Sequence, residues 1–217
     1  MNYNINDIMP YIENYEFGEY FSTREEDFLI SSISCAECPN FDWDDGASKL
    51  VLIPEDKDYV IKIPFNSSHD EFDDSYYDMS RNYCEEEIDL YNKISMEGLG
   101  GIFSQFFLPL TRVEEFQEYD IYIQPKGQVY RQVPREKRSH FYSQGSMSKV
   151  KSSNLNHYTT LPDDWIAAVV EVLKDVHLVK KFFNILSKYD IDQDLHCGNI
   201  GYYNGKPVII DYGSFYD

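Results

Sequence analysis

Residues 193–216, near the end of the sequence, have the pattern that most restricts the fold of the chain. This stretch begins with a polar run, Gln-Asp-Leu-His-Cys-Gly-Asn, in which Asp194 and Asn199 lie five residues apart. A short strand, a glycine-containing turn and the apolar strand Pro207–Ile210 then lead to Asp211, which Tyr-Gly follows. The pattern predicts a β-hairpin with Asp194 and Asn199 before it and Asp211 after it. A polar turn and an ordinary strand end are the alternative interpretations of the two halves.

Two motifs in this stretch resemble those of a known family. Protein kinases have an Asp-x-x-x-x-Asn catalytic loop, followed by an Asp-Phe-Gly whose Asp binds magnesium. The form Asp-Leu-His-x-Gly-Asn is similar to that of the aminoglycoside and other small-molecule kinases of the same superfamily. The resemblance implies an α+β, bilobal protein-kinase-like fold. We expect an N-lobe with an antiparallel sheet at 1–124 and a reduced helical C-lobe at 125–217.

The resemblance also implies a chemical role for each residue. Phosphoryl transfer depends on positioning and charge neutralisation more than on covalent participation of the protein. Asp194 would accept the proton of the attacking hydroxyl group. Magnesium prefers hard oxygen ligands and usually takes one or two of them from the protein. Asn199 and Asp211 would supply these, so the expected cofactors are ATP and Mg²⁺.

A second part of such a site is expected near the middle of the first half. Residues 49–54 and 58–65 are rich in β-forming residues and flank a turn-forming Glu-Asp-Lys, which predicts a hairpin. Lys62 lies in Val-Ile-Lys-Ile, which resembles the Val-Ala-Ile-Lys strand whose Lys binds the α- and β-phosphates. A charge facing a core needs a partner. The alternative is that Lys62 points to solvent through the alternation of the strand.

The partner of Lys62 is expected on the next helix. Residues 74–95 have a helical pattern with a broad apolar face. Of the three consecutive glutamates, only Glu87 stands on that face, four residues after Tyr83 and four before Tyr91. We therefore predict an ion pair between Lys62 and Glu87, with the other two glutamates forming a solvated acidic patch.

The remaining nucleotide contacts rest on weaker signals. The family's phosphate loop has three glycines, whereas residues 44–49 contain one, Gly46. Gly46, the Ser48 hydroxyl and nearby amides would bind a phosphate, although a plain tight turn fits this segment as well. His196 replaces the Lys that many protein kinases have two residues after the base. Its help to the transferring phosphate depends on its charge.

The pattern predicts two further strands, at 102–108 and 119–124, of which the second ends at Gln124. Residues 125–127 would form a hinge whose backbone binds adenine, with Gln124 beside it. Helical structure is expected from Thr160 to Ser187, as one helix or as two with a break near His177.

Segment 126–151 is strongly basic, with Glu136 as its one acidic residue. It is rich in Ser, Gln and Gly, and its apolar periodicity is weak, so we interpret it as a mobile loop outside the core. It would steer an acidic partner, cover the nucleotide phosphates, or carry autophosphorylation sites, for which Ser139, Ser143, Ser146 and Ser148 are candidates. A plain solvated loop is the alternative.

Composition indicates one soluble cytoplasmic domain of 217 residues. No apolar run is long enough to span a membrane, and the N-terminus lacks a secretory signal. The net charge of −19 argues against nucleic-acid binding. Cys35 and Cys38 would make half of a zinc site, but no second pair follows at the usual spacing, so free thiols are favoured.

Three departures from the family pattern affect the functional prediction. Asp192 and Gln193 replace the His and Arg that usually open the catalytic loop, which suggests no control by a phosphorylated activation segment. The His at 196 is shared with small-molecule kinases. The sequence ends four residues after Gly213. If the chain is complete, we expect a minimal kinase of phage or bacterial-effector type, acting in the (host) cytoplasm, whose substrate platform is the N-terminal 45 residues, the basic segment or an oligomeric partner.

Three functions fit these observations. The first is an ATP- and magnesium-dependent phosphotransferase, most simply a minimal serine/threonine protein kinase whose partners are ATP and a protein substrate. The second is a small-molecule kinase or a nucleotidyl transferase on the same fold. The third is a pseudokinase that binds a partner, which the reduced glycine loop favours and the joint presence of Lys62, Asp194, Asn199 and Asp211 disfavours.

Overall fold

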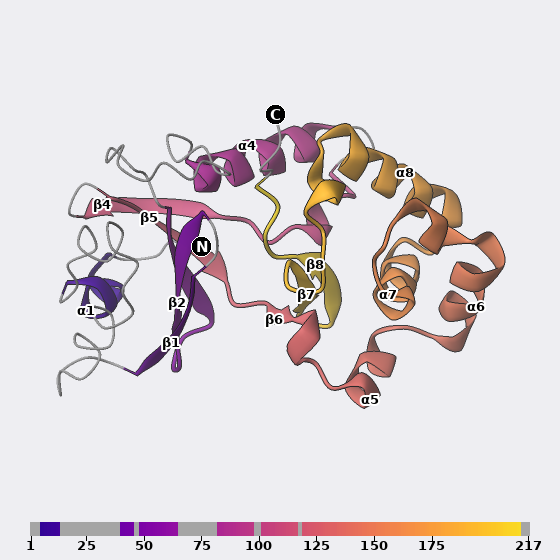
Figure 1. Ribbon diagram of the computed structural model, residues 1–217, viewed down its shortest axis with the longest axis horizontal. Coiled ribbons are helices and arrows are strands. Elements are labelled where there is room, and N and C mark those ends of the chain that lie inside the picture. Colours follow the sequence, from indigo (N-terminus) through magenta and orange to yellow (C-terminus); the bar gives the residue numbers. More distant parts are fainter. Residues whose placement is uncertain are drawn as a thin grey trace, which may run out of the picture. The chain divides into compact units, whose positions relative to one another are not determined.

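The computed structural model combines antiparallel sheets with helices, which is the α+β class expected from the sequence (Figure 1). It describes residues 5–13, 40–45, 48–64, 82–97, 101–116 and 119–213. Among these residues, no helix is both long and apolar enough to cross a membrane. The half zinc site at Cys35 and Cys38 and the predicted phosphate-binding Gly46 lie outside the described residues.

The chain divides into two compact units. The first consists of residues 1–85 and 110–126, and the second of 86–109 and 127–217. This division differs from the expected one at 124/125, because 86–109 belongs with the second unit. The physical reason is burial, since this segment contributes four residues to the core of the second unit: Ile94, Phe103, Phe106 and Phe107.

The first unit contains a five-stranded antiparallel sheet in the order β1-β2-β3-β5-β4. The hairpin predicted at 49–54 and 58–65 and the strand predicted at 119–124 are confirmed. The strands are β1 (Phe41–Asp45), β2 (Lys49–Pro54), β3 (Tyr59–Pro64), β4 (Thr111–Phe116) and β5 (Tyr119–Pro125).

One face of this sheet carries the core of the first unit. Alternate residues of the strands pack there with the short helix α1 (Met9–Ile12) and the preceding 3-10 turn η1 (Ile5–Asp7). Tyr11 of α1 donates a hydrogen bond from its hydroxyl to Asp56 Oδ1 at 2.6 Å. Burial and this bond raise the pKa of Tyr11 well above its usual value. By the same alternation, Lys62, Tyr122 and Gln124 belong to the opposite face.

Helix α4 (Tyr83–Met96) begins after Asn82, whose side-chain oxygen accepts the N–H groups of Cys84 and Glu85 at 3.1 and 3.2 Å. This is an N-cap, which satisfies two of the amides that a helix start leaves without a partner. The predicted helix at 74–95 is confirmed from residue 83 onward, and residues 74–81 lie outside the described residues.

The strand predicted at 102–108 is wrong. Residues 101–103 form a turn and Ser104–Phe106 a 3-10 helix (η2), after which Phe107 makes a single bridge to Ile209. The apolar residues explain the difference. Phe103, Phe106 and Phe107 follow a helical spacing, and all three turn into one core.

Residues 127–213 of the second unit, all of which the structure describes, form a three-stranded antiparallel sheet and four α-helices. The hairpin predicted after Asn199 is confirmed as β7 (Ile200–Tyr203) and β8 (Lys206–Ile209), and β6 (Gln128–Val129) extends it on the β7 side. The helices are α5 (Arg135–Arg138), α6 (Gln144–Ser153), α7 (Asp163–Leu173) and α8 (Val176–Lys188).

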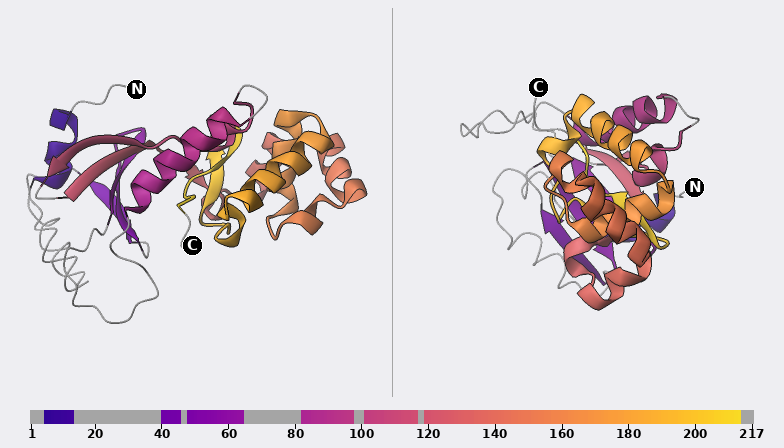
Figure 2. Two further views of the ribbon diagram at one scale, coloured as in Figure 1. Left: turned by 90° about the horizontal axis from the view of Figure 1, so that it is seen from above. Right: turned by 90° about the vertical axis from the view of Figure 1, so that its right-hand side faces the viewer.

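Helix α7 is the centre of this unit. It lies between α6 and α8 (Figures 1 and 2), and every residue from Trp165 to Val170 is buried. The break expected near His177 falls two residues earlier. Lys174 ends α7 in the left-handed region at φ 60°, and Asp175 caps α8 by accepting the N–H of His177 at 2.7 Å.

The basic segment 126–151 is folded, so the expectation of a mobile loop outside the core is wrong. It forms β6, the 3-10 turns η3 (Tyr130–Gln132) and η4 (Ser139–Phe141), α5 and most of α6. Tyr130, Val133 and Val150 are buried in the core of the second unit. These anchors are irregularly spaced, which is why the sequence shows no period here.

Polar contacts also attach this segment to α7. Glu171 of α7 accepts hydrogen bonds from the Ser146 hydroxyl at 2.6 Å and the Ser143 N–H at 3.0 Å. These bonds, led by that of Ser146, lower the pKa of Glu171 to about 2. Ser146 is therefore a buried structural residue, whereas Ser139, Ser143 and Ser148 remain exposed.

The backbones of β6 and β7 approach each other closely at Gly201 of β7. A Cβ atom there would lie 2.2 Å from the carbonyl oxygen of Gln128 in β6. The Gly201 carbonyl oxygen also accepts a hydrogen bond from Trp165 Nε1 at 3.1 Å. Glycine at this position therefore allows β6, β7 and α7 to meet.

Replacing Gly201 with alanine should lower the free energy of unfolding by roughly 3 kcal/mol, because the new methyl group requires β6 to move away from β7. Urea denaturation of the purified protein measures this change. Gly145→Ala is the matched control. Its Cβ would meet only the Ser143 Oγ, at 3.7 Å, and alanine suits a helix. Equal stability of the two variants would contradict the role given to Gly201.

Glu171→Gln should destabilise the protein at pH 7, by at most about 1 kcal/mol because the carboxylate is near solvent. The pKa of Glu171 is lowered in the folded state, so its charge stabilises the fold above the unfolded value of 4.5. That contribution disappears as the pH falls toward 2. The difference between parent and variant should therefore shrink in acid, as measured by thermal unfolding at several pH values.

The control for this experiment is Glu136→Gln, which removes an exposed carboxylate from α5. It should leave the stability unchanged at each pH. A difference between parent and Glu171→Gln that stays constant with pH would show that the carboxylate charge is not what stabilises this contact.

Candidate functional site

The loop between the 3-10 turn η6 (Ile191–Gln193) and β7 contains the predicted catalytic motif. Asn199 donates from Nδ2 to the Asp194 carbonyl oxygen at 2.8 Å and to Asp194 Oδ2 at 3.2 Å. The Asn199 N–H donates to the His196 carbonyl oxygen at 3.0 Å. These bonds close the loop on itself and hold the Asp194 carboxylate beside the Asn199 amide.

The hairpin returns the chain to the same loop. The Asn199 carbonyl oxygen accepts the N–H groups of Ile210 at 2.7 Å and Asp211 at 3.4 Å. Just inside these contacts, Ile200 pairs with Ile209 in the β7–β8 ladder. The structure thus brings together the three residues that the sequence analysis selected in this half of the chain, Asp194, Asn199 and Asp211.

The donor chemistry at this point fits a magnesium ion with two protein ligands. Asn199 uses its amide nitrogen within the loop, and its side-chain oxygen is a hard donor of the kind magnesium prefers. Asp211 adds a half-buried carboxylate. Within the described ranges, no group of three or more His, Cys, Asp or Glu side chains is placed to hold a metal ion. The pair of Asn199 and Asp211 contains only one side chain of these types, so it does not count as such a group.

His196 is exposed, and its ring is fixed by the loop backbone. Its Nδ1 accepts the N–H of Gly198 at 2.9 Å, so the neutral imidazole carries its proton on Nε2. A Cβ at Gly198 would lie 2.7 Å from His196 Cε1, so glycine makes this contact possible. His196 can therefore donate a hydrogen bond from Nε2 while it is neutral.

The two positions that depart from the kinase pattern have local roles. Asp192 accepts a hydrogen bond from the Ser187 hydroxyl near the end of α8. Gln193 donates from Nε2 to Asp190 Oδ1 at 2.9 Å. Both side chains therefore stabilise the turn that leads into the loop.

Lys62 of β3 is buried, with 2% of its surface exposed, so the alternative that it points to solvent is wrong. It pairs with Val51 on one side and Tyr122 on the other. Two other predicted nucleotide-binding residues in the first unit, Ser48 and Gln124, are also buried. The first precedes β2, and the second lies near the end of β5.

Glu87 has no exposed surface, whereas Glu85 and Glu86 are half-buried. The choice of Glu87 as the inward-facing glutamate is confirmed. Lys62 belongs to the first unit and Glu87 to the second, and the ion pair between them stays a prediction.

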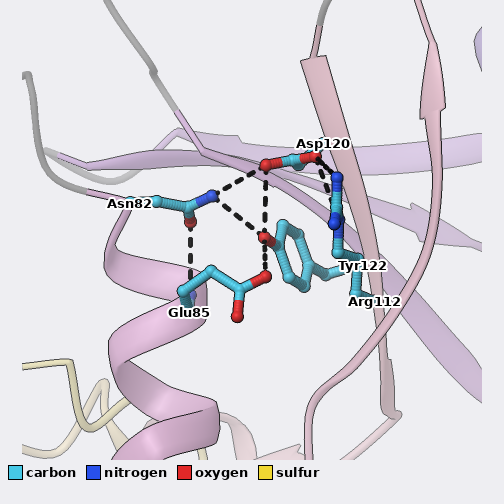
Figure 3. A network of polar contacts seen from close by, with 5 residues as sticks. All are labelled: Asn82, Glu85, Arg112, Asp120 and Tyr122. Atoms are coloured by element: carbon cyan, nitrogen blue, oxygen red, sulfur yellow. Dashed lines mark hydrogen bonds and ion pairs between the residues drawn. The ribbon is translucent and has the colours of Figure 1, made fainter.

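A polar network missed by the sequence analysis fixes the first turn of α4 to the sheet (Figure 3). The Tyr122 hydroxyl donates to Glu85 Oε1 at 2.6 Å and accepts from Asn82 Nδ2 at 2.9 Å. Asn82 also donates to Asp120 Oδ2 at 3.0 Å, and Arg112 pairs with Asp120. Burial, followed by the Glu85 bond, raises the pKa of Tyr122 far above its usual value.

The sequence contains a local signal for one part of this network, the start of α4. The Asn-x-x-Glu of residues 82–85 is a capping pattern, with Asn82 at the cap and Glu85 at the third helical position. The links to Tyr122, Asp120 and Arg112 connect distant parts of the sequence, and no local pattern predicts them.

Arg131 is the other residue that the sequence analysis did not place at the loop. It follows β6, and one of its guanidinium nitrogens lies 3.9 Å from the position that a Cβ at Gly198 would take. The pairing of Val129 with Gly201 brings it there. Arg131 is exposed, so it adds positive charge beside the residues of the loop.

Neither a protein-family model nor a curated protein sequence matches this chain.

Tyr122→Phe should lower the free energy of unfolding by about 2 kcal/mol, because it removes the donor to Glu85 and leaves polar groups around a buried position without their partner. Urea denaturation measures the change. Tyr91→Phe is the matched control on α4, since the Tyr91 hydroxyl makes no hydrogen bond to any described residue. A loss of the same size in both variants would contradict the role of the Tyr122 network.

Proposed function

We propose that the protein is an ATP- and magnesium-dependent phosphotransferase with a protein-kinase-like, two-lobed fold, and that its acceptor is a serine or threonine hydroxyl of a protein. One observation carries this proposal: the hydrogen bonds of Asn199 hold Asp194 and the backbone of Asp211 around a single loop. A general base and two magnesium ligands in this order are the parts that kinases use.

The elements of the first unit support the same proposal. In protein kinases the phosphate-binding Lys lies on the third strand, and the Glu that orients it lies on the following helix. Here β3 carries Lys62, and α4 carries Glu87. Both side chains are buried, although both belong to residue types that are rarely buried without a partner.

Each residue then has a defined role in the reaction. Lys62 would bind the α- and β-phosphates, oriented by Glu87. Asp194 would accept the proton as the acceptor oxygen forms its bond to the γ-phosphorus and the bond to ADP breaks. Mg²⁺, when bound by Asn199 and Asp211, supplies positive charge to the phosphates.

The nucleotide would be held by further contacts. Gly46 and Ser48 would contact its phosphates, and Gln124 would lie beside the adenine. His196 would donate from Nε2 to an oxygen of the transferring group. A cytoplasmic location, where ATP is abundant, belongs to the same proposal.

A small-molecule kinase is the second candidate. The observation that favours it is the hydrogen bond from the Gly198 N–H to His196 Nδ1 in an Asp-Leu-His-x-Gly-Asn loop, because small-molecule kinases of this superfamily have His at that position. Both candidates share the same chemistry at Asp194, Asn199 and Asp211, and they differ only in the acceptor.

The test is the intact mass of the purified protein after incubation with Mg-ATP, with ATP consumption measured in parallel. The parent should gain phosphate or consume ATP. Asp211→Asn should abolish both, and Asp194→Asn should lower the rate by about 10²–10⁴-fold, as expected for a lost general base. Asp163→Asn, at the start of α7, is the matched control and should behave as the parent.

Other outcomes of this experiment would contradict the proposal in specific ways. A gain of an adenylyl group would indicate a nucleotidyl transferase. If the protein binds ATP but neither gains mass nor consumes ATP, it is a pseudokinase. Consumption of ATP by Asp211→Asn at the parent's rate would remove Asp211 from the site.

A further inference from the structure

The exposed residues Arg131, Arg135 and Lys137, which we call the cationic surface, stand out in a chain whose net charge is −19. They lie within seven consecutive residues of η3 and α5. Among the described residues, neither Arg135 nor Lys137 forms an ion pair or a side-chain hydrogen bond. Glu136 is the one acidic residue among residues 131–137, so this stretch of sequence has an excess of positive charge.

Other residues of this segment make the contacts that stabilise its fold. Arg138 donates from Nε to the Val133 carbonyl oxygen at 2.8 Å, and its guanidinium lies 3.8 Å from the centre of the Tyr130 ring. The Tyr130 hydroxyl donates to Asp164 Oδ1 at 2.6 Å. Arg135 and Lys137 take no part in these contacts, so the fold does not explain their charge.

The same contacts fix the backbone under the cationic surface. Val133 is buried before Arg135, and Arg138 is bound directly after Lys137. The cations therefore stand on a folded segment anchored at both ends. A partner that binds them does not have to order this backbone, which lowers the entropic cost of association.

The cationic surface begins at the candidate catalytic loop. Arg131 lies beside Gly198, within the same compact unit as Asp194, Asn199 and Asp211. Arg135 and Lys137 continue the positive charge along the chain from that point. A ligand bound through these cations would thus extend away from the residues proposed for phosphoryl transfer.

We propose that the cationic surface binds an acidic segment of the acceptor protein, so that the substrate class of this phosphotransferase is a hydroxyl flanked by carboxylates. This inference rests on the proposed function for its chemistry, but its binding step is independent of it. Charge complementarity selects the partner and speeds its association.

An acidic protein fits this surface better than a nucleic acid does. Proteins that bind single strands combine positive charge with exposed aromatic rings on which bases stack. Tyr158 is the one large aromatic side chain that is well exposed among the described residues, and it lies outside η3 and α5. The net charge of −19 also opposes a long polyanion.

The test is a binding experiment without ATP or magnesium. The probe is a fluorescein-labelled peptide with a central Ser flanked by Glu, compared by fluorescence anisotropy with the same peptide in which Gln replaces Glu. The Glu peptide should bind the full chain at least about tenfold more tightly at low salt, and added salt should weaken it. Equal binding of the two peptides, or no binding of either, would overturn the proposal.

Arg135→Glu combined with Lys137→Glu should weaken binding of the Glu peptide by about tenfold or more, because attraction is replaced by repulsion. The matched control, Lys181→Glu with Lys206→Glu, makes the same change of charge at exposed residues of α8 and β8. It should change the affinity by less than about twofold. Equal weakening by both pairs would show a general effect of net charge and overturn the assignment.

A single-stranded RNA of the same charge as the Glu peptide completes the experiment. Tighter binding of the RNA than of the peptide would also overturn the proposal. Failure here is distinguishable from failure of the proposed function, since peptide binding is measured without nucleotide and phosphate transfer is measured by mass. Folding of each variant is checked by thermal unfolding.

Discussion

The close approach of β6 and β7 at Gly201 is the constraint on which the second unit depends. The Gln128 carbonyl oxygen occupies the place that any side chain at Gly201 would need, and Trp165 binds the Gly201 carbonyl oxygen. One glycine thus joins the buried helix α7 to two strands that are far apart in the sequence. The candidate loop precedes β7 directly, and Arg131 lies two residues after the end of β6. Their proximity is therefore a consequence of backbone packing and needs no contact between their side chains.

Burial of charge is the second constraint, and it acts in the first unit and in α4. A charged side chain is costly to bury unless other groups compensate its charge. Lys62 and Glu87 are both buried, whereas many other acidic residues of the chain are exposed. A fold that only needed to close its core would place apolar residues at both positions. In the Tyr122 network, the half-buried Glu85 carboxylate accepts a hydrogen bond from the neutral Tyr122 hydroxyl.

The sequence was sufficient to predict the structure where the signals are local, and insufficient where the structure depends on contacts between distant residues. Alternating residues around short turns predicted the β2–β3 and β7–β8 hairpins, and the position of Glu87 on α4 followed from helical spacing. The segment of α5 and α6 was misinterpreted because Tyr130, Val133 and Val150 are held by contacts with a distant helix. Phe103, Phe106 and Phe107 were assigned to a strand because their aromatic character outweighed their helical spacing. The proximity of Arg131 to the loop likewise arises only from strand pairing.

Hydrogen bonds of the Asn199 side chain and backbone close the candidate loop. The bond from Asn199 to the Asp194 carbonyl oxygen closes the loop, and the Asn199 carbonyl oxygen receives the amide of residue 211. The second contact uses only backbone atoms, so any residue at 211 would make it, and the first needs no carboxylate at 194. The Asp194 carboxylate oxygen Oδ2 accepts a further bond from the same amide at 3.2 Å, so this side chain also takes part in loop closure. Phosphoryl transfer is proposed for this loop because the hydrogen bonds of Asn199 join the Asp194 side chain and the backbone of Asp211 at one place.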